Sequence, residues 1–373
     1  MTQPAIIFHH PLPIREEGAT GSEIRPYRML RAFRELGYEV DVVAGRAAER
    51  QRAMAQVRAR MAEGKRYAFL YAESATMPTP LAEPHHLPLH PVMDLAFFRW
   101  VRQQGVPIGL FYRDVYWRFP QYRESVVWWK RWPAVAFYWA DWLGYRQWVD
   151  HLFLPSTRMG EALPTPWPPE RLSALPPGCD PQDVVDAQAG RNPADNTVRL
   201  FYVGGVTPPY YDLRPMLEAV AAVPGVSLTL CCREGEWQAV ATLYRPFLRD
   251  TVRVIHAKGR ALEPLYGQAD AFLVFRSRHP YLDFALPVKV FEALGYGVPI
   301  ITVAGTEAGR FVEQEGVGWA VDGKEALVRL IERLRDNPVE LARMRQAVQA
   351  ARWRHTWVAR AQEAARVLEG RLR

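Results

Sequence analysis

Short apolar runs of strand length alternate with helical segments along almost the whole of this 373-residue chain. The runs are too continuously apolar to be strands with one face in water, so they indicate buried parallel strands. The alternation therefore predicts an α/β fold in which helices cover parallel sheets. The predicted strands are residues 5–9, 38–45, 67–73, 106–112 and 151–156 in the first half, and 198–204, 226–232, 252–256, 271–275, 299–303 and 318–322 in the second.

A stretch rich in Pro and Gly divides this alternation in two. Residues 155–197 are dense in Pro, Gly, Asp and Asn, a composition typical of turns and linkers. We therefore expect two Rossmann-like, doubly wound parallel-sheet domains that face each other across a cleft, over residues 1–165 and 198–350, with a linker over 166–197. Residues 351–373 are expected to form a C-terminal helix that packs back toward the N-terminal domain.

Composition narrows the classes of protein that the chain can belong to. It has no run of about 18 uncharged apolar residues and no secretion-signal pattern at its N-terminus, so we expect a cytoplasmic protein. Its cysteines, Cys179, Cys231 and Cys232, suit neither a disulfide framework nor a zinc site. The net charge of +7 predicts a polyanionic neighbour, whether nucleic acid, anionic lipid or phosphorylated substrate.

The segment DFALPVKVFEALGYGVPII, residues 283–301, predicts a short helix that carries a polar strip. Pro287 suits the first helical position and Gly297 the residue just past the helix end. Lys289 and Glu292 then share one side of the helix, near the carboxyl end of a strand, where ligands bind in open α/β sheets. The helix start can hold phosphate and the carboxylate can accept hydrogen bonds from a ribose diol. An ordinary exposed ion pair between Lys289 and Glu292 is the alternative.

This segment also resembles a known family. The order of a Pro, K-x-F-E and G-x-P-I-I is similar to the nucleotide-sugar site of GT-B glycosyltransferases, particularly those of glycosyltransferase family 4. LFYVGGVTPPYYDLRPMLEAV resembles the strand, diglycine turn and helix that open the donor domain of that family. ADAFLVF resembles the strand before its ribose-binding helix, LPPGCD its interdomain segment and FLPSTRM the end of a strand in its first domain.

The resemblance implies specific donor contacts. Glu292 would hold the donor ribose, and the backbone of Pro287, Val288 and Lys289 would approach the diphosphate. Gly204 and Gly205 would let the main chain come close to the donor phosphates, as glycine permits. The alternative for these two glycines is a tight turn without a ligand.

Two positions depart from the family pattern. Phe284 stands where the family often has a second Glu, with Asp283 as the nearest acid, and TPPYY follows the diglycine where the family commonly has an Arg and a Lys. Another cation must then neutralise the leaving diphosphate. The candidates follow predicted strands and are Arg233, Arg276 and Arg278, with solvated loop arginines as the alternative reading.

The N-terminal half offers residues for the acceptor side. The loop after the first strand contains Gly18, Gly21 and Ser22, which the resemblance places near the donor diphosphate and the acceptor. Asp114 follows another strand and could orient or deprotonate an acceptor hydroxyl, or it could cap the next segment and pair with Arg113. His9 and His10 end the first strand, where either could touch substrate or be structural.

Residues 126–148 are rich in aromatic side chains. We expect most of this segment to be a core helix, with Trp128, Trp129 and Trp132 exposed. Together with Lys130 and nearby arginines, these tryptophans could dock on an anionic membrane.

The resemblance implies transfer of a sugar from a nucleotide sugar, such as a UDP- or GDP-sugar, to a hydroxyl of a sugar, glycolipid or polysaccharide acceptor in cell-envelope synthesis. No D-x-D motif for holding a metal occurs, and the resemblance implies retaining transfer without metal and without a cofactor. A nucleotide-sugar epimerase of GT-B type is one alternative. A noncatalytic basic protein that binds membrane or nucleic acid is the other, although no nucleic-acid motif is present and nucleic acid is not expected as a partner. The expected location is the cytoplasm, with a peripheral position at the inner face of the membrane as an option.

Overall fold

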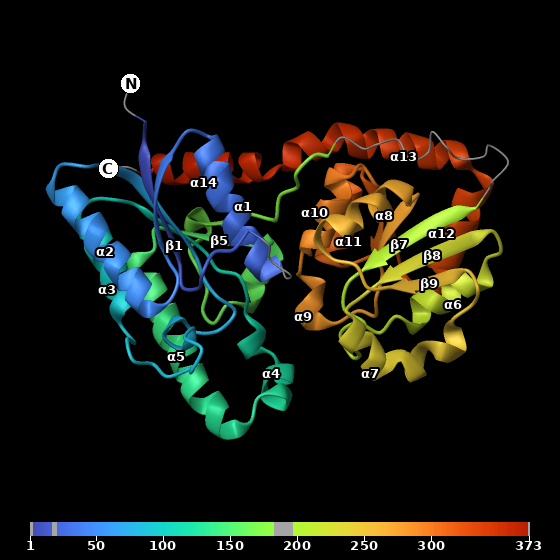
Figure 1. Cartoon of the computed structure of the whole chain (residues 1–373), viewed down its shortest axis with the longest axis horizontal. Coiled ribbons are helices and arrows are strands. Elements are labelled where there is room, and N and C mark those ends of the chain that lie inside the picture. Colours follow the sequence, from blue (N-terminus) through green and yellow to red (C-terminus); the bar gives the residue numbers. More distant parts are fainter. Residues whose placement is uncertain (1–2, 17–20, 183–196, 372–373) are drawn as a thin grey trace. The chain divides into compact units, whose positions relative to one another are not determined.

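The computed structural model describes residues 3–16, 21–182 and 197–371. Its chain divides into two compact units (Figure 1). Unit 1 comprises residues 1–177 and 357–373, and unit 2 comprises residues 178–356. Each unit is built around one six-stranded parallel sheet, which confirms the predicted α/β class with two Rossmann-like domains.

Unit 1 has the strand order β2-β1-β3-β4-β5-β6, and every neighbouring pair is parallel. One sheet face is covered by α1 and by the C-terminal helix α14, whose Ala361 and Leu368 join Phe33 in a buried cluster. The strands are β1 Ala5–His10, β2 Glu39–Ala44, β3 Tyr67–Glu73, β4 Ile108–Phe111, β5 His151–Leu154 and β6 Leu172–Ala174. The helices are α1 Gly21–Glu35, α2 Ala47–Ala62, α3 Met93–Gln103, α4 Pro120–Ser125, α5 Trp128–Trp148 and α14 Trp357–Glu369.

Strand β6 was not expected, because it lies inside the Pro-rich stretch that the sequence assigns to linker and turn. Its three residues, LSA, pair in parallel with β5 and extend the sheet at its edge. The other strands coincide with the predicted apolar runs to within one or two residues at each end.

Unit 2 repeats the architecture with the order β12-β11-β10-β7-β8-β9. Two buried clusters fill the two faces of its sheet: one lies under α6, α7 and α12, and the other under α8, α10, α11 and α13. The strands are β7 Val198–Val203, β8 Val226–Cys231, β9 Val252–Ile255, β10 Ala271–Val274, β11 Ile300–Val303 and β12 Gly318–Val321. The helices are α6 Arg214–Ala222, α7 Glu234–Tyr244, α8 Glu263–Gln268, α9 Pro280–Asp283, α10 Val288–Gly295, α11 Glu307–Glu315, α12 Gly323–Asp336 and α13 Pro338–Ala351.

Both sheets contain a point where the strand order reverses. In unit 1 it lies between β1 and β3, and in unit 2 between β7 and β10. Ligands of doubly wound sheets bind beyond the carboxyl ends of the strands at such points. The strand orders therefore direct attention to the residues after β1, β3, β7 and β10.

Candidate functional site

A small pocket lies at the carboxyl edge of the sheet in unit 2. Its walls come from the ends of β10 and β11 and from the starts of α10 and α11, which places it beside the reversal point of the strand order. It is lined by Val274, Arg276, Pro287, Thr302, Val303, Thr306 and Ala308. Two of the residues that the sequence predicts for the donor site, Arg276 and Pro287, thus line the same pocket.

Arg276 is the cation of this pocket and is held by main-chain oxygens. Its Nη2 donates to the carbonyl oxygen of Leu282 at 2.9 Å and its Nη1 to that of Ser277 at 3.2 Å. Burial lowers the pKa of this guanidinium, and the carboxylate of Asp283 opposes that shift. A half-buried cation that is anchored by carbonyls can stabilise an anion without first reorganising.

Two helix starts complete the pocket. The Oγ1 of Thr306 caps α11 by accepting from the amide of Gly309 at 3.0 Å and donates to the carbonyl oxygen of Val303 at 2.6 Å. Helix α10 begins at Val288, one residue later than the sequence predicts, and Pro287 is its N-cap. Because the first amides of a helix have no partner within the helix and sit at the positive end of its dipole, these two starts favour a bound anion.

Glu292 lies one turn further along α10 and is fixed by two donors. Lys289 Nζ donates to its Oε2 at 2.7 Å, and the hydroxyl of Tyr266 donates to the same oxygen at 3.1 Å. The ring of Tyr266 stacks on Tyr296, with centroids 4.6 Å apart and planes 10° from parallel. The ion pair that was the alternative reading is therefore present. Both of its members nevertheless keep access to solvent, since their side chains are 31% and 25% exposed.

The other two arginines point to local partners instead. Arg233 is 62% exposed and pairs with Glu236 at 2.8 Å, within the first turn of α7. Arg278 pairs with Asp283 at 3.0 Å and also donates to the carbonyl oxygen of Gly305. Neither lines the pocket, which favours Arg276 among the three.

The diglycine turn after β7 is explained by packing inside unit 2. A Cβ on Gly204 would lie 2.9 Å from the hydroxyl of Tyr202, and one on Gly205 would lie 2.7 Å from the ring of Tyr211. The Tyr202 hydroxyl also donates to the carbonyl oxygen of Gly205 at 2.5 Å. A side chain at either position would therefore displace an aromatic neighbour, and the approach of these glycines to donor phosphates stays a prediction.

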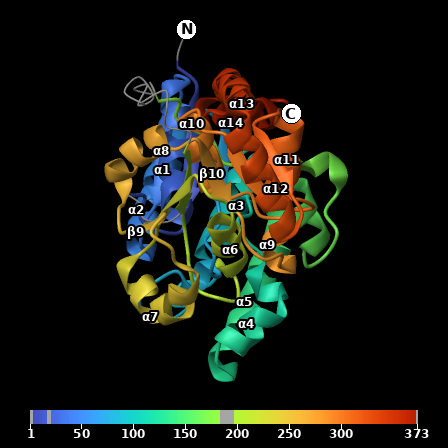
Figure 2. The ribbon, with the colours of Figure 1, turned by 90° about the vertical axis from the view of Figure 1, so that its right-hand side faces the viewer.

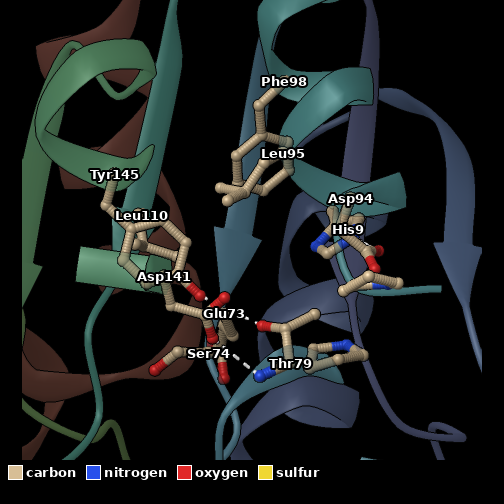
Figure 3. Close-up of a pocket in the computed structure, with 12 residues that line it drawn as sticks. His9, Glu73, Ser74, Thr79, Asp94, Leu95, Phe98, Leu110, Asp141 and Tyr145 are labelled. Carbon is tan, nitrogen blue, oxygen red and sulfur yellow. Dashed lines mark hydrogen bonds and ion pairs between the residues drawn. The ribbon is translucent and has the colours of Figure 1, made fainter. Parts of the chain in front are cut away.

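A second pocket lies at the reversal point of unit 1 (Figure 3). At one side of this pocket, Nε2 of His9 lies 2.7 Å from Oδ1 of Asp94. Arg50 donates to the same carboxylate from Nε at 2.9 Å and from Nη2 at 3.1 Å. The buried Nδ1 of His9 makes no hydrogen bond within the described part of the chain.

Asp141 lies across this pocket, near Thr79 in Figure 3. Its Oδ2 accepts from the amide of Thr79 at 2.7 Å. Burial raises the pKa of Asp141 to about 7, although the hydrogen bonds from Thr79 lower it. The pocket therefore combines a histidine oriented by a carboxylate with a carboxyl that titrates near neutrality, a combination suited to binding and deprotonating a hydroxyl.

Glu73 is the third acid beside this pocket, and it is fully buried. Its Oε1 is 3.2 Å from Nε of Arg25, and its Oε2 accepts from Nη2 of Arg113 at 3.1 Å. Asp114 accepts from the amide of Tyr116 at 2.8 Å, so it caps the short turn Tyr116–Arg118. The capping alternative for Asp114 is therefore present, and its role toward an acceptor stays a prediction.

The loop after β1 is described only in part. Gly18 lies outside the described residues, whereas Gly21 is the first residue of α1 and Ser22 the second. His10 differs from His9 because its Nδ1 contacts the carbonyl oxygen of Glu73 at 3.1 Å. Burial and the charge of Arg113 lower the pKa of His10 to about 3, which keeps its ring neutral.

Several residues of the two pockets were not predicted from the sequence. Asp94 and Asp141 occur in helices without any local motif, and Thr306 reaches its pocket through tertiary packing. Tyr266 lines neither pocket, but its contact with Glu292 also depends on tertiary packing. Thr306 carried one usable signal, since a Thr just before a helix is a common N-cap.

Part of this chain matches a known family model. Residues 211–366 match a family model described as glycosyl transferase-like. A search of curated proteins gave no match.

Solved structures show the same fold over almost the whole chain. Anabaena HepE, solved with UDP and glucose, has a TM-score of 0.64 at 16% identity and covers 98% of this chain and 100% of its own. Sucrose-phosphate synthase from Thermosynechococcus elongatus has a TM-score of 0.62 at 14% identity and covers 98% of both chains. A glycosyltransferase from Rickettsia africae has a TM-score of 0.66 at 11% identity and covers all of both chains. This chain therefore has the two-domain fold of these solved structures, and residues 211–366 are similar to a glycosyl transferase-like family.

Proposed function

We propose that the protein transfers a sugar from a nucleotide sugar to an acceptor hydroxyl, with the donor bound in unit 2. The observation that carries this proposal is the pocket in which Arg276 meets the starts of α10 and α11, with Glu292 one turn further along α10. A diphosphate matches the cation and the two helix starts, and a ribose diol matches the carboxylate. HepE, which shares the fold, has been solved with UDP-glucose.

The finer chemistry belongs to the same proposal. Arg276 and the helix starts would neutralise the leaving diphosphate without a metal, a cofactor or a protein nucleophile, and the anomeric configuration would be retained. The acceptor would be a sugar, glycolipid or polysaccharide hydroxyl in cell-envelope synthesis at the cytoplasmic face of the membrane. Asp114 and the pocket of His9 and Asp94 would serve the acceptor.

A panel of UDP-, GDP-, ADP- and dTDP-sugars tests the donor. At a concentration 100 times its dissociation constant, the matching donor should stabilise the fold by about 2.7 kcal/mol, seen as a rise in unfolding temperature. Incubation of that donor with candidate acceptors, with and without EDTA and with the product read by NMR, decides metal dependence and stereochemistry. A new sugar formed without any acceptor would favour the epimerase alternative, and a panel without any shift would contradict the proposal.

Arg276→Gln is expected to lower kcat/KM about 100-fold, because it removes a preorganised charge from the leaving diphosphate. Arg233→Gln is the matched comparison, because it removes an arginine that also follows a strand of the same sheet but is exposed and locally paired. Its kcat/KM should stay within about twofold, since an exposed ion pair contributes little. Equal losses in the two variants, or a larger loss at Arg233, would contradict the assignment.

A further inference from the structure

Helix α5 carries apolar side chains along most of its outward face as well as on its inward face. The buried residues Ala134, Tyr138, Trp142 and Tyr145 form the inward face. On the outward side the exposed residues Trp129, Trp132, Ala136, Ala140 and Leu143 are separated by three or four residues, which is the spacing of one helix side, and the exposed polar residues Arg146 and Gln147 follow at its end. A surface helix of a globular protein normally carries charged residues there.

Three exposed tryptophans concentrate at the start of this face. Trp128, Trp129 and Trp132 are 64%, 59% and 67% exposed, as the sequence analysis expects, and Leu143 near the other end is 59% exposed. Within unit 1, α4 and the start of α5 extend beyond the sheet (Figures 1 and 2). Exposed large apolar side chains at such a projecting end mark an interaction surface for a protein or a membrane.

The charges around this face favour an anionic occupant. Residues 116–148 contain five basic residues, Arg118, Arg123, Lys130, Arg131 and Arg146, but only the two acids Glu124 and Asp141. Asp141 is buried, so Glu124 is the only acid among them at the surface. A second copy of the chain would bring the same cations against each other, because a twofold interface uses the same patch twice.

We propose that the outward face of α5 is an interfacial anchor that docks unit 1 on a membrane of anionic lipids. Trp128, Trp129 and Trp132 would enter the headgroup region, where their apolar rings and polar N–H groups are both satisfied. Lys130 and the neighbouring arginines would meet the lipid phosphates. With 21 residues α5 is about 31 Å long, but its other side is packed in unit 1, so it would lie in the plane of the interface. None of the helices among the described residues is long and apolar enough to cross a bilayer.

Co-sedimentation with vesicles tests this anchor. The full chain should bind vesicles of phosphatidylcholine with phosphatidylglycerol and should bind pure phosphatidylcholine vesicles far more weakly. Replacement of Trp128, Trp129 and Trp132 by Ser should weaken binding to the anionic vesicles at least about tenfold. Lys130→Gln with Arg123→Gln should weaken it about tenfold as well and should reduce its salt dependence.

The matched control replaces three exposed apolar residues of unit 2, Leu243, Val339 and Trp353, by Ser and should bind vesicles like the parent. The donor-induced rise in unfolding temperature should be unchanged in every variant, so failure of the anchor and failure of the proposed function are distinguishable. The anchor proposal is overturned if the parent ignores anionic vesicles or if the tryptophan variant binds them equally well. A dimer that dissociates only in the tryptophan variant, without lipid binding by the parent, would identify the face as a contact between copies and would also overturn it.

Discussion

Glu292→Ala is expected to lower the affinity for the nucleotide sugar about 100- to 10,000-fold and to abolish the donor-induced rise in unfolding temperature. The carboxylate would accept two hydrogen bonds from the ribose diol, and bonds to a charged group are worth about 1.5 to 3 kcal/mol each. The contacts in the structure support this, since Tyr266 and Lys289 both donate to Oε2 and hold the side chain in one orientation. Isothermal calorimetry on the variant measures the loss.

The matched control for this variant is Glu218→Ala. Glu218 also forms a Lys–Glu pair in unit 2, with Lys324 at 2.8 Å, but it lies on α6, away from the pocket residues in the chain. Removing it should leave donor affinity unchanged. Glu292→Gln should fall between the parent and Glu292→Ala, because an amide keeps one acceptor but loses the charge. Full donor affinity in Glu292→Ala would place the ribose elsewhere.

Glu73→Ala is expected to destabilise unit 1 by about 3 to 5 kcal/mol, because it leaves buried positive charge without its partner. Glu73 is fully buried and faces both Arg25 and Arg113. The free energy of unfolding in urea measures the loss. Tryptophan fluorescence reports mainly on this unit, since ten of the 13 tryptophans lie in residues 1–177 and 357–373.

An exposed acid of the same unit serves as the comparison. Glu39 pairs with Lys65 at 2.8 Å, but its side chain is 55% exposed. Glu39→Ala should therefore cost less than about 1 kcal/mol. If Glu73→Ala unfolds at the same urea concentration as Glu39→Ala, the buried network does not stabilise unit 1 as argued.

The sequence predicts the elements well where the signal is local. Helix α10 could be delimited because Pro287 caps its start and Gly297, with φ of +71°, follows it. Strand β6 could not be predicted, because three residues between prolines are too few to show an alternation of apolar and polar side chains. Only their pairing with β5 makes them a strand. Glu292 could be proposed as a site residue because Lys289, which shares its side of the helix, lies only three residues away in the sequence.

The remaining site residues depend on contacts between distant parts of the chain. Arg233 and Arg276 look alike in the sequence, since each follows a buried strand. Only the strand order separates them: Arg276 follows a strand at the reversal point, whereas Arg233 follows β8, one position further out. Likewise, His9 is 85 residues from Asp94, and no local pattern links them.

The C-terminal helix has a consequence for the order in which the protein is completed. Leu368 of α14 fills the space that the missing side chain of Gly109 in β4 leaves open, and Tyr38 donates to Glu369 at 2.6 Å. Unit 1 therefore needs residues that the ribosome makes only after all of unit 2 has been synthesised. On the ribosome, unit 1 begins to emerge before unit 2 but closes its core only after unit 2 has been made, and until then the sheet face that α14 covers stays exposed to water and to chaperones.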